Sequence, residues 1–431
     1  MKKGFWTLRY TIINVLYFAA FCTIHAYATV FLLDRGFTNT MVGVALAVSN
    51  ILAVLGQPLV AGMIDKSEKI TNRKVLLCSV LIILTGVLLL MAVGNNIPLV
   101  FALYVIIYTV QFISMSIMIA MSFEYQAGGC EHNFGLARGL GSAGFAVTSA
   151  ITGRIMAQKG PVINLYITSV VMILMFVAVF TFRRRGDTTD ASVKLVGVAE
   201  DCVKPDEGSV KPDAGEIDGG VKPNSGEEPI NNFFDFIRTY PTFMLFLLGA
   251  ALCFFSHNML NDYLILIIRN LGGGETELGY ASFLQAILEL PVMAVMAGLL
   301  KKINVKAILV FSTVAFFIKV VIMYLSTGLG GMYLSQSFQL FAYAVFIPAT
   351  AFYSDRIMRE KDKVKGQAYV NCAITLGGVF SSLICGKILD VNGVSYMLFI
   401  GMIVAFVGAV ISTLALVKGN DGKSKAMASE T

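Results

Sequence analysis

The sequence is poor in the residues on which soluble enzymes and metal sites depend. Of its 431 residues one is Trp, three are His and seven are Cys, and only 14% are charged, whereas soluble domains carry ~25%. The cysteines lack CxxC spacing, which indicates small packing residues rather than a disulfide or metal framework. No G-x-x-x-x-G-K-[ST] phosphate loop occurs. These absences argue against a soluble enzyme, a dense metal cluster and an ATP-driven machine.

Apolar residues dominate what is present. They make up 56% of the chain, or about 241 residues, and twelve membrane spans of ~20 residues need roughly 240. Twelve apolar segments are centred near residues 22, 52, 85, 109, 147, 172, 255, 289, 316, 341, 376 and 405. The first run is longer than a signal-peptide core and lacks a small-residue cleavage site, so we expect no cleaved leader. The sequence predicts an all-α integral membrane protein with twelve transmembrane helices.

The basic residues predict its orientation. With a cytoplasmic N-terminus, 26 of the 33 Lys and Arg residues fall on the cytoplasmic side and three (Arg35, Lys159 and Arg269) on the other. This asymmetry is the positive-inside rule. We therefore expect a multi-pass protein of the cell membrane with both termini in the cytoplasm. No exposed basic surface with aromatics is offered for nucleic acid.

One polar segment divides the chain. Residues 183–238 hold 20 of the 60 formal charges and a degenerate repeat, VKPDEGS, VKPDAGE and VKPNSGEE. Such composition predicts a disordered cytoplasmic linker, either a plain tether or a regulatory loop. It separates an N-terminal six-helix bundle (1–182) from a C-terminal one (239–418), with a cytoplasmic tail at 419–431.

The two halves resemble each other in sequence. Ala61-Gly-Met-Ile-Asp-Lys66 aligns with Ala297-Gly-Leu-Leu-Lys-Lys302 at an offset of 236, and Gly153-Arg-Ile-Met156 aligns with Gly386-Lys-Ile-Leu389 at 233. Matches in the same order at nearly the same offset indicate a duplicated unit. Two parallel repeats of six helices, with a solute site at their interface, are a known transporter plan.

Three motifs resemble the major facilitator superfamily. The segment Gln57 to Lys66 followed by Arg73-Lys74 is similar to its G-x-x-x-D-R/K-x-G-x-R/K-R/K signature, with Ala61 in place of the first glycine and two extra residues. Phe134-Gly-Leu-Ala-Arg138-Gly-Leu-Gly-Ser-Ala-Gly-Phe145 resembles the helix 5 opening of the lactose-permease-like branch. Glu289-Leu-Pro291 before Lys301-Lys302 resembles its helix 8. The resemblance implies a transporter of the oligosaccharide and nucleoside proton symporter type, with Phe145 at the family's sugar-stacking position.

The resemblance fails in helix 10. There the family carries a His and, three residues on, a Glu, whereas this chain has Gln339 and Ala342. Proton coupling must therefore be argued from other residues. Glu289 lies near the middle of helix 8 and Lys319 near the middle of helix 9, where an unpaired charge costs ~2.5–3.5 kcal/mol. The expected coupling residues are Glu289, Asp262 and Lys319. The alternative for Glu289 is a satisfied helix–helix contact with Lys319 as its partner, and the alternative for Asp262 is a position high enough in the span to be hydrated.

The remaining candidates fall into two sets. In helix 7 the spacings 257/261 and 258/262 place four polar residues on one stripe. The expected substrate-binding set is Arg138, Glu124, Phe145, His257, Asn258, Asn261 and Gln285. The expected gating set is Asp65, Lys66, Arg73 and Lys74. His25 is expected to be a packed or hydrogen-bonded core residue.

These observations predict a function. The expected protein is a monomeric secondary transporter, not an enzyme, that moves a small sugar- or nucleoside-like solute by proton symport and needs no cofactor beyond the gradient. One alternative is an exporter of amphipathic compounds by proton antiport. A membrane enzyme or receptor is the more distant alternative, because three dispersed histidines offer no dense acid–base constellation.

Overall fold

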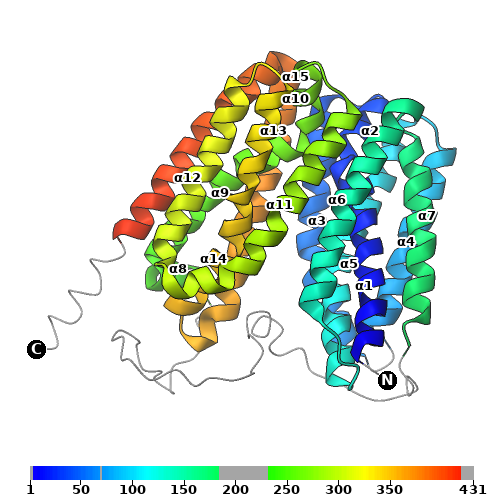
Figure 1. Ribbon diagram of the computed structural model, residues 1–431, viewed down its shortest axis with the longest axis horizontal. Coiled ribbons are helices and arrows are strands. Elements are labelled where there is room, and N and C mark those ends of the chain that lie inside the picture. The colour runs from blue at the N-terminus through cyan, green and yellow to red at the C-terminus, as the bar shows by residue number, and fades with distance from the viewer. Residues whose placement is uncertain (1–2, 68–69, 184–231, 419–431) are drawn as a thin grey trace, which may run out of the picture.

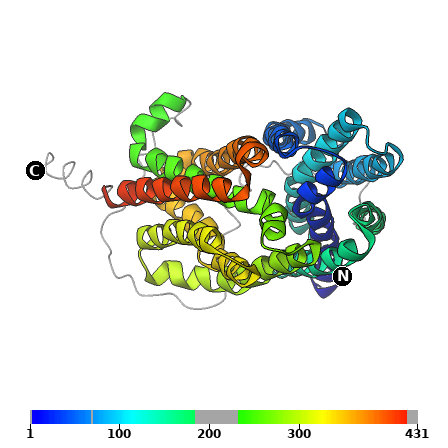
Figure 2. The ribbon, with the colours of Figure 1, turned by 90° about the horizontal axis from the view of Figure 1, so that it is seen from above.

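The computed structural model describes residues 3–67, 70–183 and 232–418, and within these ranges every regular element is helical. The predicted tail at 419–431 and most of the predicted linker lie outside them. Figure 1 shows the helices gathered in two bundles, one coloured blue to blue-green and the other green to red, and Figure 2 shows the same two bundles from above. The predicted all-helical membrane fold is confirmed.

The first half contains six long helical segments, the first of which is broken near its end. Its elements are α1 (Lys3–Phe21), the π-helical turn η1 (Cys22–Ala26), α2 (Ala28–Asp34), α3 (Asn39–Asp65), α4 (Asn72–Ala92), α5 (Ile97–Ala127), α6 (Phe134–Lys159) and α7 (Ile163–Thr181). Four of them start at a polar cap, in which Thr38, Thr71, Asn96 or Asn133 accepts a hydrogen bond from a backbone N–H of the first turn.

The second half repeats this pattern. Its elements are α8 (Phe233–Thr239), α9 (Pro241–Asp262), α10 (Leu264–Asn270), α11 (Glu275–Lys302), α12 (Val305–Leu325), α13 (Leu329–Ser337), the 3₁₀ turns η3 (Phe338–Leu340) and η4 (Glu360–Asp362), α14 (Tyr343–Ile357) and α15 (Lys363–Lys418). Gly393, at φ +78°, joins two helices within α15. A side chain is strained at such a positive φ, which makes glycine the natural residue at this bend.

The predicted linker boundary at 238 needs correction. Residues 233–239 form α8 because Phe236 is buried there, against the rings of Tyr240 and Tyr369 at 4.9 and 4.7 Å between centroids. The polar composition of the preceding residues hid this short apolar anchor.

Eight helices in the described ranges are long and apolar enough to cross a membrane, with the two helices of α15 counted as one. The other predicted spans correspond to α6, to α11 and to the broken pair α13–α14. Eleven of the twelve predicted centres fall inside helices, and the centre at 341 falls at the break between η3 and α14. At this break the hydroxyl of Ser312 donates to the carbonyl of Ala342 at 2.7 Å.

The two halves pack on each other mainly through α6 against α11 and through α3 against α15. The cross-half hydrogen bonds lie on the side of the molecule away from Lys3 and Lys418, which we call the far side. There Ser149 Oγ donates to the carbonyl of Gly279 at 3.1 Å. Gly153 faces the backbone of Glu275 and Gly279 so closely that it has no room for a Cβ. Figure 1 shows the bundles diverging toward the opposite, termini side.

A carboxylate adds a second kind of cross-half contact on the far side. Asp390 of α15 accepts four hydrogen bonds at the start of α3, from the backbone and side chain of Asn39 at 3.0 and 2.8 Å and from those of Thr40 at 2.8 and 2.6 Å. A carboxylate at a helix N-terminus is stabilised by the unpaired N–H groups and the helix dipole. We call this contact the Asp390 latch.

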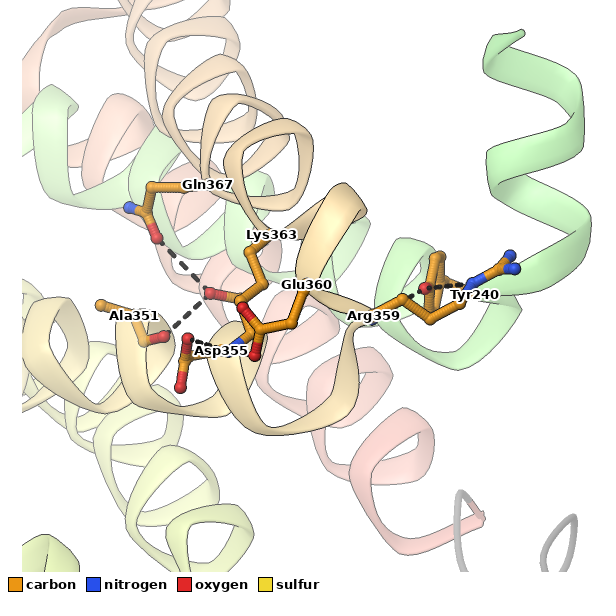
Figure 3. A network of polar contacts seen from close by, with 8 residues as sticks. Tyr240, Ala351, Asp355, Arg359, Glu360, Lys363 and Gln367 are labelled. Atoms are coloured by element: carbon orange, nitrogen blue, oxygen red, sulfur yellow. Dashed lines mark hydrogen bonds and ion pairs between the residues drawn. The ribbon is translucent and has the colours of Figure 1, made fainter. Parts of the chain in front are cut away.

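Polar contacts on the termini side tie the start of α9 to the turn between α14 and α15 (Figure 3). The hydroxyl of Tyr240 donates to Asp362 at 3.0 Å and accepts from the backbone N–H of Arg359 at 3.2 Å. Lys363 bridges Asp355 and Glu360 at 2.8 and 2.7 Å. These contacts link elements of the second half to one another.

Candidate functional site

A buried lysine, an amide and a carboxylate form a chain in the second half, which we call the charge triad. Lys319 of α12 is fully buried, and its Nζ donates to Gln339 Oε1 at 2.8 Å. Gln339 Nε2 in turn donates to Glu289 Oε1 at 2.9 Å. The structure thus brings together Lys319 and Glu289, which the sequence predicted as partners, through Gln339 rather than directly.

Four uncharged polar residues lie beside the triad and form the polar cluster. Asn261 Nδ2 is 3.0 Å from His257 Nε2, and Gln285 Nε2 donates to Asn261 Oδ1 at 3.2 Å. Gln285 Nε2 also contacts Gln336 Oε1. The cluster therefore joins α9, α11 and α13, and the ring of His257 stacks on Tyr343 of α14 at 5.3 Å and 16°.

The predicted single stripe on helix 7 divides into two faces. His257 and Asn261 belong to the polar cluster, whereas Asn258 lies against Gly378 of α15. Asp262 accepts a hydrogen bond from Ser382 Oγ of α15 at 2.7 Å, and its backbone carbonyl accepts from Thr29 Oγ1 of the first half. The reason is geometric, because residues 258 and 262 are turned by one position, about 100°, from 257 and 261 on the helix. Asp262 therefore lies at the far-side contact, away from the charge triad.

Arg138 is the charged residue that the first half contributes toward the second. Its guanidinium lies over the ring of Phe18 at 4.1 Å, and Nη1 donates to Ser142 Oγ at 2.9 Å. It is within electrostatic range of Glu289 and Tyr343 across the interface. Phe145, two turns farther along α6, lies 6.4 Å from Phe21. Arg138 and Phe145 thus face one region between the halves.

Among the described residues, Glu124 is bonded within its own half, away from this group. Its Oε2 accepts a hydrogen bond from Asn72 Nδ2 at 2.8 Å, near the start of α4 on the termini side. The expected role of Glu124 in binding stays a prediction, and its local partner is Asn72.

The predicted gating residues lie on the termini side. Asp65 ends α3 and is exposed, and Lys66 follows it as the C-cap. Arg73 Nη1 donates to the carbonyl of Phe180 at 3.1 Å, and the backbone N–H of Lys74 donates to the capping hydroxyl of Thr71 at 3.4 Å. Their gating role stays a prediction.

The structure adds residues that the sequence argument did not place in the site. Gln336 and Gln339 stand one turn apart in the broken tenth span, and both bond to candidate residues. Their spacing within one span is a signal in the sequence, although an uncharged amide stands out there less than a titratable group. Asp390 gave no signal at all, since an acidic residue near a predicted loop is ordinary.

Comparisons with known proteins agree on the fold. A model of the MFS_1 like family matches residues 7–400. The chain superposes on a crystal structure of a variant of the nucleoside transporter NupG with a TM-score of 0.74 at 13% identity, covering 96% of this chain and 99% of that chain. An unsubstituted NupG structure gives 0.71 at 13% identity, covering 96% and 98%.

A third solved structure is a bacterial homologue of the human lysosomal transporter Spinster, in an inward-facing and unoccupied conformation. It gives a TM-score of 0.62 at 13% identity, covering 96% of this chain and 97% of that chain. No curated protein matches the sequence. At 13% identity, these TM-scores show a shared fold. The family match covers most of the chain, and the protein is therefore a multi-pass membrane protein of the MFS_1 like family, within the major facilitator superfamily of transporters.

Proposed function

We propose that this protein is a proton-coupled symporter that moves a small polar solute, sugar- or nucleoside-like, across the cell membrane by alternating access. We further propose that both termini are cytoplasmic, that the protein acts as a monomer and that it uses only the proton gradient. The observation that carries the proposal is the charge triad. A fully buried lysine whose charge is balanced through an amide by a carboxylate is costly in a membrane and is typical of a proton or substrate pathway.

The direction of the hydrogen bonds in the triad gives it a chemical function. A lysine ammonium only donates, so Gln339 presents its oxygen to Lys319 and its NH₂ group to Glu289. Glu289 therefore accepts, which is the role of a carboxylate. When Glu289 takes up a proton, the charge that balances Lys319 is lost. The triad thus has two charge states that differ by one proton, which is what coupling requires.

The link to alternating access comes from the first half. Arg138 lies within electrostatic range of Glu289 but belongs to the other bundle. A rocking of the bundles changes this separation and the hydration around Glu289, and with them the affinity of the carboxyl for a proton. Hydrogen bonds join the halves at the far-side end of the interface, and we propose that this end is the outer one and that the termini side faces the cytoplasm.

The polar cluster supports a polar solute. His257, Asn261, Gln285 and Gln336 offer donors and acceptors without a net charge, which suits hydroxyl and amide groups. An exporter of amphipathic compounds is the second candidate, favoured by the aromatic rings around Phe21 and Phe145. The NupG structures, which are of a nucleoside transporter, support the first candidate by fold.

The test uses purified protein in liposomes with Glu289→Gln, which mimics the protonated carboxyl. Wild type is expected to accumulate uridine, adenosine or lactose when an inward proton gradient is imposed. The variant should lose accumulation yet exchange labelled for unlabelled solute at equal concentrations, because exchange needs no deprotonation. Asp262→Asn serves as the matched control and should still accumulate solute.

Two results would contradict the proposal. Accumulation by Glu289→Gln under the pH gradient would make Glu289 structural and Asp262 the next candidate. Proton-driven extrusion of an amphipathic dye from wild-type liposomes, with no uptake of the three polar solutes, would favour the exporter.

A further inference from the structure

The π-helical turn η1 fixes one histidine between the two parts of the first span. Tyr104 of α5 donates to the carbonyl of Ile24, and Asn164 of α7 donates to the carbonyl of Thr23 at 2.7 Å. These side chains satisfy backbone groups in the turn, so it is held by its neighbours. Single π-helical turns occur frequently at functional sites. Here the turn determines the position of His25.

His25 is the centre of a group of aromatic rings that we call the ring cluster. Its imidazole stacks on the ring of Phe21, with 4.0 Å between the centroids and 12° between the planes. The ring centroids of Tyr108 and Phe112 lie 3.8 and 5.6 Å from that of His25. Phe145 of α6 contacts the same Phe21. Phe21 covers one face of the imidazole and tilted rings crowd around it, so His25 offers hydrogen bonds along its edge, where its two nitrogens lie.

That edge is unused among the described residues. Both ring nitrogens of His25 are buried, and neither has a hydrogen-bond partner there. An unsatisfied buried polar group costs ~1–3 kcal/mol, and in native structures it usually has a reason. His132 shows the contrast, since its Nε2 lies 2.6 Å from Ser122 Oγ and its Nδ1 lies 2.9 Å from the carbonyl of Cys130.

The position of His25 places it at the closed end of the candidate site. Phe18, Phe21 and His25 follow each other at helical spacing, and Arg138 lies over Phe18 at the first of these positions. Tyr27, two residues after His25, donates to the carbonyl of Ser149 in the same half at 2.6 Å, and its hydroxyl lies beside Gly153 and Gly279 in the far-side contact. Tyr108 is within electrostatic range of Asp262 in the second half. His25 thus lies on the first span between the Phe18 position contacted by Arg138 and the far-side contact.

We propose that His25 is a substrate-binding residue whose two ring nitrogens are kept free for an uncharged planar heterocycle. The inference rests on the proposed function and deepens it by naming the class of solute. A neutral imidazole offers one donor and one acceptor, which match the N–H and carbonyl groups of a nucleobase, while the surrounding rings match its flat faces. Phe112 and Phe145 are only partly buried and have no polar anchor, so they can turn aside to admit it.

The test compares two variants of the full-length protein in detergent, with uridine, adenosine and lactose as probes. His25→Phe keeps a ring but removes both nitrogens, and it should weaken binding by at least tenfold. It should also leave the melting temperature of the ligand-free protein unchanged or raised, because the unsatisfied group is gone. His25→Gln keeps a donor and an acceptor and should bind within about threefold of wild type.

His132→Phe is the matched control. It should lower the melting temperature, since both nitrogens of His132 are bonded. A similar drop in His25→Phe would overturn the inference, because it would show that His25 is a structural residue with protein or water partners. Nucleoside binding that persists in His25→Phe would overturn it as well, while leaving the proposed function intact. Wild-type binding of lactose but neither nucleoside would overturn the heterocycle alone, and no wild-type binding of any of the three would overturn the proposed function.

Discussion

Arg138 shows how a single side chain can serve the site without being neutralised by a neighbouring carboxylate. It lies over the face of Phe18, which stabilises a guanidinium by ~0.5–2 kcal/mol. Ser142 accepts one of its N–H groups, although a guanidinium has five donors in a fixed fork. We propose that the remaining donors are available to a solute.

Replacing Arg138 with Lys should therefore weaken solute binding by more than tenfold, because an ammonium cannot reproduce the fork. Equilibrium binding of the solute identified in the uptake assay measures the effect, and Ser142→Ala is the control that should stay within a few-fold of wild type. An unchanged dissociation constant in Arg138→Lys would remove this residue from the site.

His132 predicts a pH dependence of stability. It lies in the connection between α5 and α6, where burial lowers its pKa below the ordinary 6.5 despite the opposing hydrogen bond to the Cys130 carbonyl. The fold therefore favours the neutral ring. Its stabilisation is complete above about pH 6.5 and is lost as the pH falls below that value. Melting temperatures at about pH 8 and about pH 5.5 should differ more in wild type than in His132→Gln. Equal differences would show that other groups set the acid response.

At the scale of helices, much was predictable because it depends on composition over many residues. The lengths of the apolar segments predict the spans, and Thr or Asn caps mark the starts of α3 to α6. The two breaks could not be predicted. The π turn at His25 and the 3₁₀ turn at Gln339 depend on side chains from other helices, such as Tyr104 and Lys319, and a sequence read along one helix does not reveal them.

The candidate site was predictable in part for the same reason. Charged residues inside apolar spans are conspicuous in the sequence, as Glu289, Lys319 and Arg138 are. Their partners are uncharged amides, and an amide in a helix carries no signal of its own. The division of helix 7 into two faces likewise depends on α15 lying next to Asn258 and Asp262.

The Asp390 latch supports a prediction at this scale. Asp390→Asn keeps one acceptor oxygen but loses the charge and the bonds of the second oxygen, and hydrogen bonds to charged groups contribute ~1.5–3 kcal/mol each. The far side should open more often. Cys385, buried in α15 one turn before Asp390, reports this opening through its rate of modification by a small maleimide, mapped by mass spectrometry. We expect a several-fold increase.

Glu277→Gln is the control for the latch. Glu277 accepts from the backbone N–H of Gly274 at 2.7 Å, within its own helix start, so the Cys385 rate should stay unchanged. A Cys385 rate in Asp390→Asn equal to wild type would show that the other far-side contacts hold this side closed without the latch.

At the scale of the whole molecule, hydrogen bonds join the halves on the far side, and we propose that alternating access requires the termini side to close in turn. Asp65 is exposed at the termini-side end of α3, and we propose that it meets the second half when that side closes. Asp65→Asn should slow solute uptake several-fold while leaving the dissociation constant within a few-fold of wild type. Uptake rates in liposomes and equilibrium binding measure the two effects. If Asp65→Asn lost solute binding while its uptake rate at saturating solute stayed at the wild-type value, a role in closure would be ruled out.

The far-side seal is chemically different along its two edges. Along α6 and α11 it consists of close backbone approach at Gly153 and Gly279 and an uncharged hydrogen bond from Ser149, whereas along α3 and α15 a carboxylate is added. The start of α11 needs no such help, because Glu277 caps it from within. Dissolved ions screen the charge of a carboxylate and water competes for its hydrogen bonds, whereas salt has little effect on a close backbone contact. We therefore expect high ionic strength to weaken only the edge formed by α3 and α15. When the far side opens, the first gap should appear along α15.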